Sequence, residues 1–164
     1  MHMYNAIVIT VSDRCYKGER EDLAGPAVKS LLESNGYKVS ELILVPDEEL
    51  LIKQALTECV NNEYSLIITT GGTGFSKRDI TPECTKAIIE RETPGISEYM
   101  RYKSSEITNR AVLSRGVSGI KNKSLIVNLP GSPKAATENL GFVINALEHG
   151  LKMLLSKSSD CANE

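Results

Sequence analysis

The apolar residues of this chain form short runs that alternate with amphipathic segments. Runs at 6–11, 64–70 and 125–129 are rich in β-branched residues or leucine and are typical of strands buried on both faces. The partly alternating segment 38–45 predicts a fourth strand. Apolar residues recur at helical spacing between the strands. The predicted helices cover residues 23–35, 46–60, 81–91, 93 onward and 132–155.

Strands and helices alternate along the chain, without a repeat or a linker. This order predicts an α/β fold, a three-layer α/β/α sandwich around a mostly parallel sheet. The 164 residues suffice for one domain, which we place at 1–156, followed by a polar tail at 157–164. Residues 14–22 are polar and predict a loop, whereas 105–123 carry no clear pattern.

The charge of the chain is small in total but uneven along the sequence. With 19 basic and 21 acidic residues the net charge is −2, which argues against a protein that coats nucleic acid. Residues 101–134 hold seven basic residues and one acid, and residues 41–63 hold six acids and one base. The basic block could neutralise an anionic substrate, and a solvated face is the alternative.

The cysteines indicate the compartment. They are Cys15, Cys59, Cys84 and Cys161, and no two form a C-x-x-C pair. Scattered cysteines in a chain with its own core predict reduced thiols, a cytoplasmic location and no zinc site. The first residues lack the features of a signal peptide, and the apolar runs are far shorter than the ~20 residues of a membrane span, so we expect no membrane partner.

A glycine-rich loop follows the third predicted strand. Its residues are Thr70, Gly71, Gly72, Thr73 and Gly74. Glycines let backbone N–H groups approach an anion, and open α/β sheets bind ligands at the carboxyl ends of their strands. Neither a Walker A loop nor the dinucleotide fingerprint fits, since a lysine stands where the third glycine of the fingerprint belongs. A tight turn without a ligand is the alternative.

Acidic residues lie near the same predicted edge of the sheet. Asp79 follows the glycines and could hold Mg²⁺ together with phosphate oxygens, although it could also be a turn residue. Asp47 follows the second strand, where it could instead cap the next helix. Ser12-Asp13 and Gly131-Ser132 end two further strands there. The convergence of these strand ends predicts an anion-binding site.

These segments occur together in an order typical of one family. They are Thr70-Gly71-Gly72-Thr73-Gly74, Arg78-Asp79-Ile80-Thr81-Pro82-Glu83, Pro94-Gly95 with Glu98, Leu113-Ser114-Arg115, and Pro130-Gly131-Ser132-Pro133. From Val8 to about Leu155, the chain closely resembles the Mog/MoaB family of molybdenum-cofactor biosynthesis proteins. The Pro46-Asp47-Glu48 segment is more similar to the Mog type than to the MoaB type.

The resemblance implies a molybdopterin adenylyltransferase, which transfers AMP from ATP to the terminal phosphate of molybdopterin and releases pyrophosphate. It implies Mg²⁺ as cofactor, a homotrimer or a dimer of trimers, and the molybdenum-insertion protein of the pathway as a partner. By family likeness Asp79 and Asp47 are catalytic and hold Mg²⁺. The implied phosphate or nucleotide residues are Thr70 to Gly74, Ser12, Asp13, Gly131 and Ser132, and the implied pterin residues are Glu98, Ser114 and Arg115. The alternative is a non-catalytic MoaB-like pterin-binding or scaffold protein.

Overall fold

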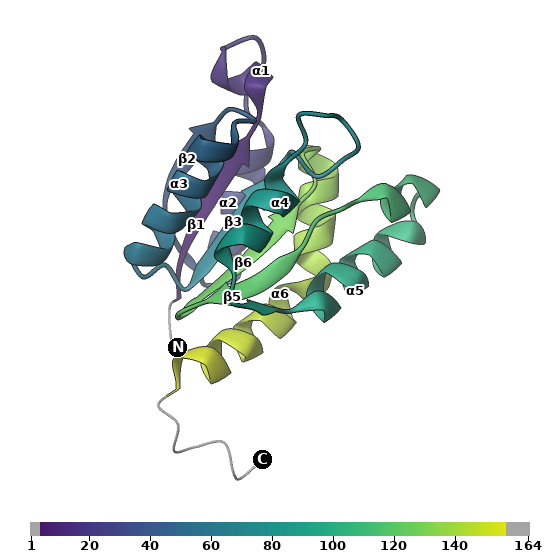
Figure 1. Ribbon diagram of the computed structural model, residues 1–164. Helices are drawn as coiled ribbons and strands as arrows, with labels where there is room; N and C mark the ends of the chain where they lie inside the picture. Colours follow the sequence, from purple (N-terminus) through teal and green to yellow (C-terminus); the bar gives the residue numbers. More distant parts are fainter. Residues whose placement is uncertain (1–3, 157–164) are drawn as a thin grey trace.

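The computed structural model describes residues 4–156, which build a six-stranded sheet with the order β2-β1-β3-β6-β5-β4 (Figure 1). The first four strands in this order run parallel, and β5 runs antiparallel to both of its neighbours. The strands are β1 (Asn5–Val11), β2 (Lys38–Val45), β3 (Leu66–Thr70), β4 (Arg91–Glu92), β5 (Ser118–Lys121) and β6 (Ser124–Leu129). The predicted mostly parallel sheet is therefore confirmed.

Helices cover both faces of the sheet and complete the predicted three layers (Figure 1). They are α1 (Asp13–Tyr16), α2 (Ala24–Ser34), α3 (Glu49–Asn61), α4 (Thr81–Ile88), α5 (Pro94–Ser105), the 3-10 helix η1 (Asn109–Leu113) and α6 (Pro133–Leu155). Helices α2, α5 and α6 pack on one face, and α3 and α4 pack on the other. Within residues 4–156, none of the helices has both the length and the apolarity that crossing a bilayer requires.

Strand β1 is apolar throughout because it is buried on both faces. Ala6 and Val8 contact the core under α2 and α6, whereas Ile7 and Ile9 contact the core under α3 and α4. Successive side chains of a strand point to opposite faces, so a central strand between two helical layers needs apolar residues at every position.

The order of the strands creates a crevice at one edge of the sheet. Strand β1 lies between β2 and β3. After β1 the chain continues into α2 on one face of the sheet, and after β3 it continues into α4 on the other face. Connections that diverge in this way leave a crevice outside the carboxyl ends of the two strands, where open α/β sheets bind ligands. The glycine-rich loop follows β3 at this point.

Two sequence-based expectations about the elements are wrong, and one segment without a prediction contains regular structure. Residues 14–22 do not form a loop throughout, because the short helix α1 begins at Asp13. The helix predicted to run to Arg91 ends at Ile88, since Ile89 is extended and the amide of Glu90 donates to Ile120 O at 2.8 Å. The uninterpreted segment 105–123 contains η1 and β5. Strand β5 forms a tight hairpin with β6, and β4 pairs with β5 farther along the chain; no hydrophobic periodicity signals either strand.

Within residues 4–156, neither α4 nor α6 begins with a side-chain cap hydrogen bond. Thr81 is the first residue of α4 rather than its N-cap, and its hydroxyl donates to Gly71 O at 2.9 Å. Ser132 is at the N-cap of α6, but no cap hydrogen bond from its side chain is present within residues 4–156. Cys59 and Cys84 are buried free thiols, as expected. Cys161 and the predicted tail at 157–164 lie outside the described residues.

Candidate active site

The glycine-rich loop turns sharply where β3 ends. Gly71 and Gly72 have positive φ angles of 99° and 65°, a conformation that side chains with a Cβ disfavour. A Cβ on Gly71 would also lie 2.2 Å from the carbonyl oxygen of Val11. The amide of Gly71 donates to Leu129 O at 3.1 Å, so the turn is tied to β6. Glycine is therefore required here by both backbone angle and space.

The turn leaves backbone donors available to a ligand. The amides of Gly72, Thr73 and Gly74 have no acceptor among the residues that the structure describes. Successive backbone N–H groups that lack protein acceptors form a favourable site for phosphate oxygens. This arrangement supports the anion-binding role predicted for the loop.

Asp47 and Asp79 converge on the glycine-rich loop from two different strand connections. A Cβ on Gly72 would lie 3.1 Å from Asp47 Oδ1, and a Cβ on Gly74 would lie 2.9 Å from Asp79 Oδ2. Burial raises the pKa of the Asp47 carboxyl, and the nearby carboxylates of Asp13 and Asp79 raise it further. Two carboxylates that repel each other beside phosphate-binding amides form an environment that favours a cation.

The sequence left open that Asp47 caps a helix and that Asp79 is a turn residue, and the structure differs for the two. Asp47 does not cap α3, since Glu48 occupies the N-cap position and the Asp47 carboxylate accepts from Asp13 N at 2.8 Å. Asp79 does make the turn contact expected of the alternative, since Asp79 Oδ2 accepts from Ser76 N at 2.9 Å. This contact also holds the carboxylate close to Gly74.

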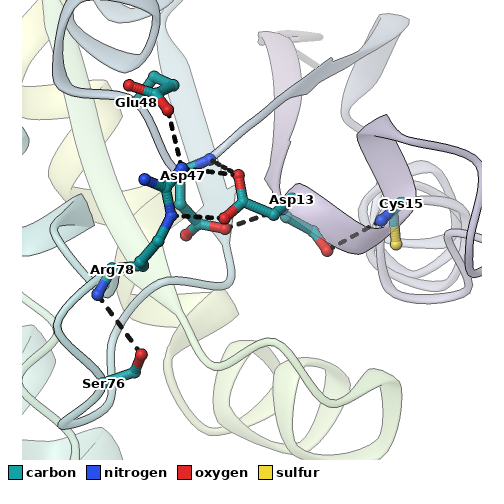
Figure 2. Close-up of polar contacts among 7 residues, drawn as sticks. Asp13, Cys15, Asp47, Glu48, Ser76 and Arg78 are labelled. Atoms are coloured by element: carbon teal, nitrogen blue, oxygen red, sulfur yellow. Dashed lines mark hydrogen bonds and ion pairs between the residues drawn. The ribbon is translucent and has the colours of Figure 1, made fainter.

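Arg78 joins the connections after β1, β2 and β3 into one network (Figure 2). Its Nε donates to Asp13 Oδ2 at 2.6 Å, and its Nη2 donates to Asp13 Oδ1 at 2.9 Å and to Glu48 Oε1 at 2.8 Å. The hydrogen bonds from Arg78 lower the pKa of the Asp13 carboxyl. Asp13 Oδ1 also accepts from Asp47 N at 3.1 Å, which braces the loop that carries Asp47.

A polar pocket of about 310 Å³ opens at the crevice between β1 and β3. Here "polar pocket" means the space lined by the strand ends of β1, β3 and β6 and by the start of α2. Of the predicted site residues, those lining it are Ser12, Asp47, Thr70, Gly71, Gly72, Asp79, Gly131 and Ser132. The structure therefore brings together most of the residues expected to bind phosphate or nucleotide.

A second and larger pocket of about 520 Å³ lies beside the first. This "apolar pocket" is lined by apolar residues of η1 and α6 and by polar residues from α5 and the glycine-rich loop. Its lining includes Ile107, Leu113, Ala135, Arg101, Arg110, Ser104, Asn139 and Ser114. Thr73 and Gly74 line this pocket rather than the polar one, and Ser132 lines both. The two pockets therefore share an edge at the glycine-rich loop.

Ser104 is the most unusual residue of the apolar pocket. Its side chain is buried, with 8% of the residue exposed. Its hydroxyl has no hydrogen-bond partner among residues 4–156. A buried polar group without a partner costs free energy, so a ligand group that reached this hydroxyl would relieve that cost.

Three predicted site residues line neither pocket. Asp13 is engaged by Arg78, and its carboxylate braces the polar pocket from outside. Glu98 is exposed on α5, on a part of the helix away from the apolar pocket. Arg115 is tied to the glycine-rich loop through Gly74 O at 2.7 Å. The expectation that these side chains contact substrate stays a prediction.

Sequence reasoning missed several polar residues of the two pockets. Arg101, Ser104 and Asn139 were not among the candidates, and Arg20 and Asp22 of the polar pocket were not either. Ser104 on α5 and Asn139 on α6 are polar residues on the buried side of amphipathic helices, with 8% of each residue exposed. A polar residue on the apolar side of a helix is the one sequence signal that could have indicated them.

Comparisons with known proteins agree with this geometry. A family model described as "probable molybdopterin binding domain" matches residues 7–149. The molybdopterin adenylyltransferase of Helicobacter pylori strain J99 is 40% identical over 151 residues, covering 90% of this chain and 86% of that protein. Gephyrin of Dictyostelium discoideum is 41% identical over 160 residues, covering 92% of this chain. The chain spans only 22% of the length of that gephyrin.

The fold also matches solved structures. The molybdopterin biosynthesis enzyme MoaB of Thermus thermophilus superimposes with a TM-score of 0.89 at 42% identity, covering 94% of this chain and 98% of that one. The match of the family model over most of the chain confirms the resemblance drawn from the motifs. The chain belongs to the family of molybdopterin binding domains found in molybdenum-cofactor biosynthesis proteins.

Proposed function

We propose that this protein is a molybdopterin adenylyltransferase that transfers AMP from ATP to the terminal phosphate of molybdopterin. One observation carries the proposal: Asp47 and Asp79 converge on a glycine-rich loop at the shared edge of two pockets. A binding or scaffold protein has no need to place two repelling carboxylates beside free backbone donors. The name of the similar Helicobacter pylori protein supports the same reaction.

The two pockets suit the two halves of this reaction. We assign ATP to the polar pocket and the pterin to the apolar pocket, so that their phosphates meet at Gly72, Thr73 and Ser132. An oxygen of the pterin phosphate then forms a bond to the α-phosphorus, and the bond from that phosphorus to the β-phosphate oxygen breaks. Pyrophosphate leaves with the electron pair. The protein contributes mainly positioning and charge stabilisation.

The residues present fit Mg²⁺, which we propose as the cofactor. Mg²⁺ prefers oxygen ligands and is commonly held by one or two carboxylates together with substrate phosphates. Asp47 and Asp79 supply two such carboxylates, and no cluster of three or more metal-ligating side chains is present within residues 4–156. When bound, Mg²⁺ would neutralise charge on the phosphates. Burial raises the pKa of Asp47 most, and a cation there would also relieve the repulsion from Asp79 that raises it further.

We further propose a homotrimer, or a dimer of trimers, in the cytoplasm, with the molybdenum-insertion protein as a partner. Exposed apolar side chains gather on α5, on η1 and between them, which supports an oligomer. They are Tyr99, Tyr102, Ile107, Val112 and Leu113. Light scattering tests the oligomeric state: a mass of three or six chains supports this assembly, and a monomer of 17.9 kDa contradicts it.

The reaction is tested by incubating the protein with molybdopterin and Mg·ATP. We expect pyrophosphate and adenylylated pterin in equal amounts. Asp79→Ala should lower turnover at least ~100-fold, the low end of losses when an electrostatic catalytic group is removed. The matched control is Glu63→Ala, an exposed acid at the opposite end of β3, which should keep the wild-type rate. Pterin binding without turnover by folded wild-type protein would instead support the scaffold alternative.

A further inference from the structure

We propose that Arg115 is a positioning residue that fixes the loop carrying Asp79 and links the apolar pocket to the polar pocket. This inference rests on the proposed function, since it assigns a role within the same site. It differs from the expected role of Arg115 as a direct pterin contact. Three observations support this role: the contacts of the guanidinium group, the exposure of the loop, and the position of Arg115 in the chain.

Each nitrogen of the Arg115 guanidinium group donates to a protein acceptor. Nε donates to Gly74 O at 2.7 Å, Nη2 donates to Asp79 O, and Nη1 pairs with Glu83. The backbone amide of Arg115 adds a hydrogen bond to Thr73 O at 3.0 Å. The planar fork of arginine can hold the two ends of a loop at once, which the single ammonium group of lysine cannot reproduce.

The loop between these two carbonyl groups is held by Arg115 and, near its end, by Arg78, which pairs with Asp13 and Glu48. Residues 75–78 are exposed, and 71% of Phe75 is exposed. Inside the loop, Asp79 N donates to Ser76 O at 3.0 Å, and Ser76 N donates to the Asp79 carboxylate. Exposed segments with few buried contacts open locally at low free energy. The clamp from Arg115 therefore limits where the Asp79 carboxylate lies.

The chain places this clamp directly between the two pockets. Leu113 and Ser114, the two residues before Arg115, line the apolar pocket, whereas Asp79 lines the polar pocket. A ligand that orders the segment around Ser114 therefore also favours the loop position that presents Asp79. Such a link is reciprocal, so occupation of either pocket should raise affinity for the other ligand.

The first test needs no substrate and compares amide hydrogen exchange in ligand-free proteins. In Arg115→Ala, the amides of Ser76 and Asp79 should exchange at least about tenfold faster than in wild type, and Arg115→Lys should restore only part of the protection. Amides of β3 should keep their wild-type rates. The control is Arg91→Ala, an exposed arginine on β4 that lines neither pocket. Unchanged exchange at Ser76 and Asp79 in Arg115→Ala would overturn the proposal.

The second test separates positioning from substrate contact by steady-state kinetics. A misplaced catalytic group lowers kcat, so Arg115→Lys should lose about tenfold or more in kcat while its KM for molybdopterin stays within about threefold. A rise in KM with unchanged kcat would show a direct pterin contact and contradict the proposal. If wild-type protein shows no turnover, the proposed function fails, and the exchange experiment still tests the clamp independently.

Discussion

Asp47 combines a structural contact with an unfavourable electrostatic position. Its carboxylate accepts the amide of Asp13 at 2.8 Å, which anchors the connection after β1. Burial and the carboxylates of Asp13 and Asp79 nevertheless raise its pKa, so the charged form costs free energy in the folded protein. Stored repulsion of this kind is typical of sites that bind a cation or a group bearing one.

We therefore expect Asp47→Asn to stabilise the protein while it abolishes activity. The amide keeps an oxygen that can accept from Asp13 N, and it carries no charge to repel Asp79. Thermal unfolding at pH 7 should show Tm raised by about 2–4 °C, the shift that ~1 kcal/mol produces in a chain of this size. Turnover should fall at least ~100-fold. A lower Tm of folded Asp47→Asn would show that other groups already compensate the negative charge of Asp47.

The pH dependence of this difference follows from the direction of the pKa shift. Because the pKa of Asp47 is higher in the folded than in the unfolded state, the folded state holds more protons between the two values. The contribution of Asp47 to stability is thus present at low pH and is lost as pH rises through its folded pKa. The gap in Tm between Asp47→Asn and wild type should shrink as pH is lowered from 7 toward 4. A gap independent of pH would contradict this origin.

Ser104 offers a prediction about the pterin. Its buried hydroxyl lacks a partner among residues 4–156, so Ser104→Ala should not lower Tm of the ligand-free protein. It should raise the KM for molybdopterin by about 2–10-fold, the range of one hydrogen bond, and leave the KM for ATP unchanged. The exposed neighbour Ser105, changed to alanine, serves as control. An unchanged pterin KM in Ser104→Ala would remove this residue from the pterin site.

At the scale of elements, glycines act differently in the loop and in α6. Gly71 has φ 99° and sits where a Cβ would meet Val11 O, whereas a Cβ added to Gly141 within α6 would have nothing inside 4 Å. A Cβ on Gly131 would lie 3.2 Å from Gly71 Cα, so the connections after β3 and β6 touch. Residues of both connections, Gly71 and Gly131, line the polar pocket.

Alanine substitutions at the two glycines should have opposite effects. Gly71→Ala should lower the free energy of unfolding by at least ~2 kcal/mol because of backbone strain and the contact with Val11 O. Gly141→Ala should raise it by about 0.5–1 kcal/mol, since alanine restricts the unfolded chain and favours the helix. Urea denaturation measures both values. Equal effects of the two substitutions would contradict the role of the turn.

At the scale of the whole molecule, the two charged segments take part in neighbouring pockets. Arg101 and Arg110 from the basic block line the apolar pocket, and Asp47 from the acidic block lines the polar pocket. The net charge of −2 thus conceals an uneven distribution across one site. A phosphate-rich pair of substrates with a divalent cation suits both signs.

The predicted domain boundary at residue 156 can be tested on the whole molecule. Both hydrophobic cores and both pockets are formed by residues 4–156. We expect a chain ending at Ser156 to keep Tm within about 2 °C of the full chain. A shift of that size corresponds to a change of less than ~1 kcal/mol in the free energy of unfolding. Turnover should be unchanged. A larger loss would place the boundary beyond Ser156.

The alternation of strands and helices and the glycine-rich turn after β3 could be predicted from the sequence alone. Burial on two faces demands apolar runs such as 6–11, and a turn with positive φ demands glycine at Gly71 and Gly72. These requirements act on neighbouring residues, so the sequence displays them directly. Their positions after predicted strands singled out Asp47 and Asp79, and the family resemblance added their catalytic role.

Only the tertiary structure decided which side chains meet. Strand β4 forms because Arg91 pairs with Ile120 of β5, and Arg78 reaches Asp13 across 65 positions of sequence. Arg115 was expected at the pterin, and the fold places its guanidinium group on the loop of Asp79, whereas the buried hydroxyl of Ser104 has no partner within residues 4–156. The reason is physical: periodicity reports the face on which a residue lies, whereas its partners depend on how distant elements pack.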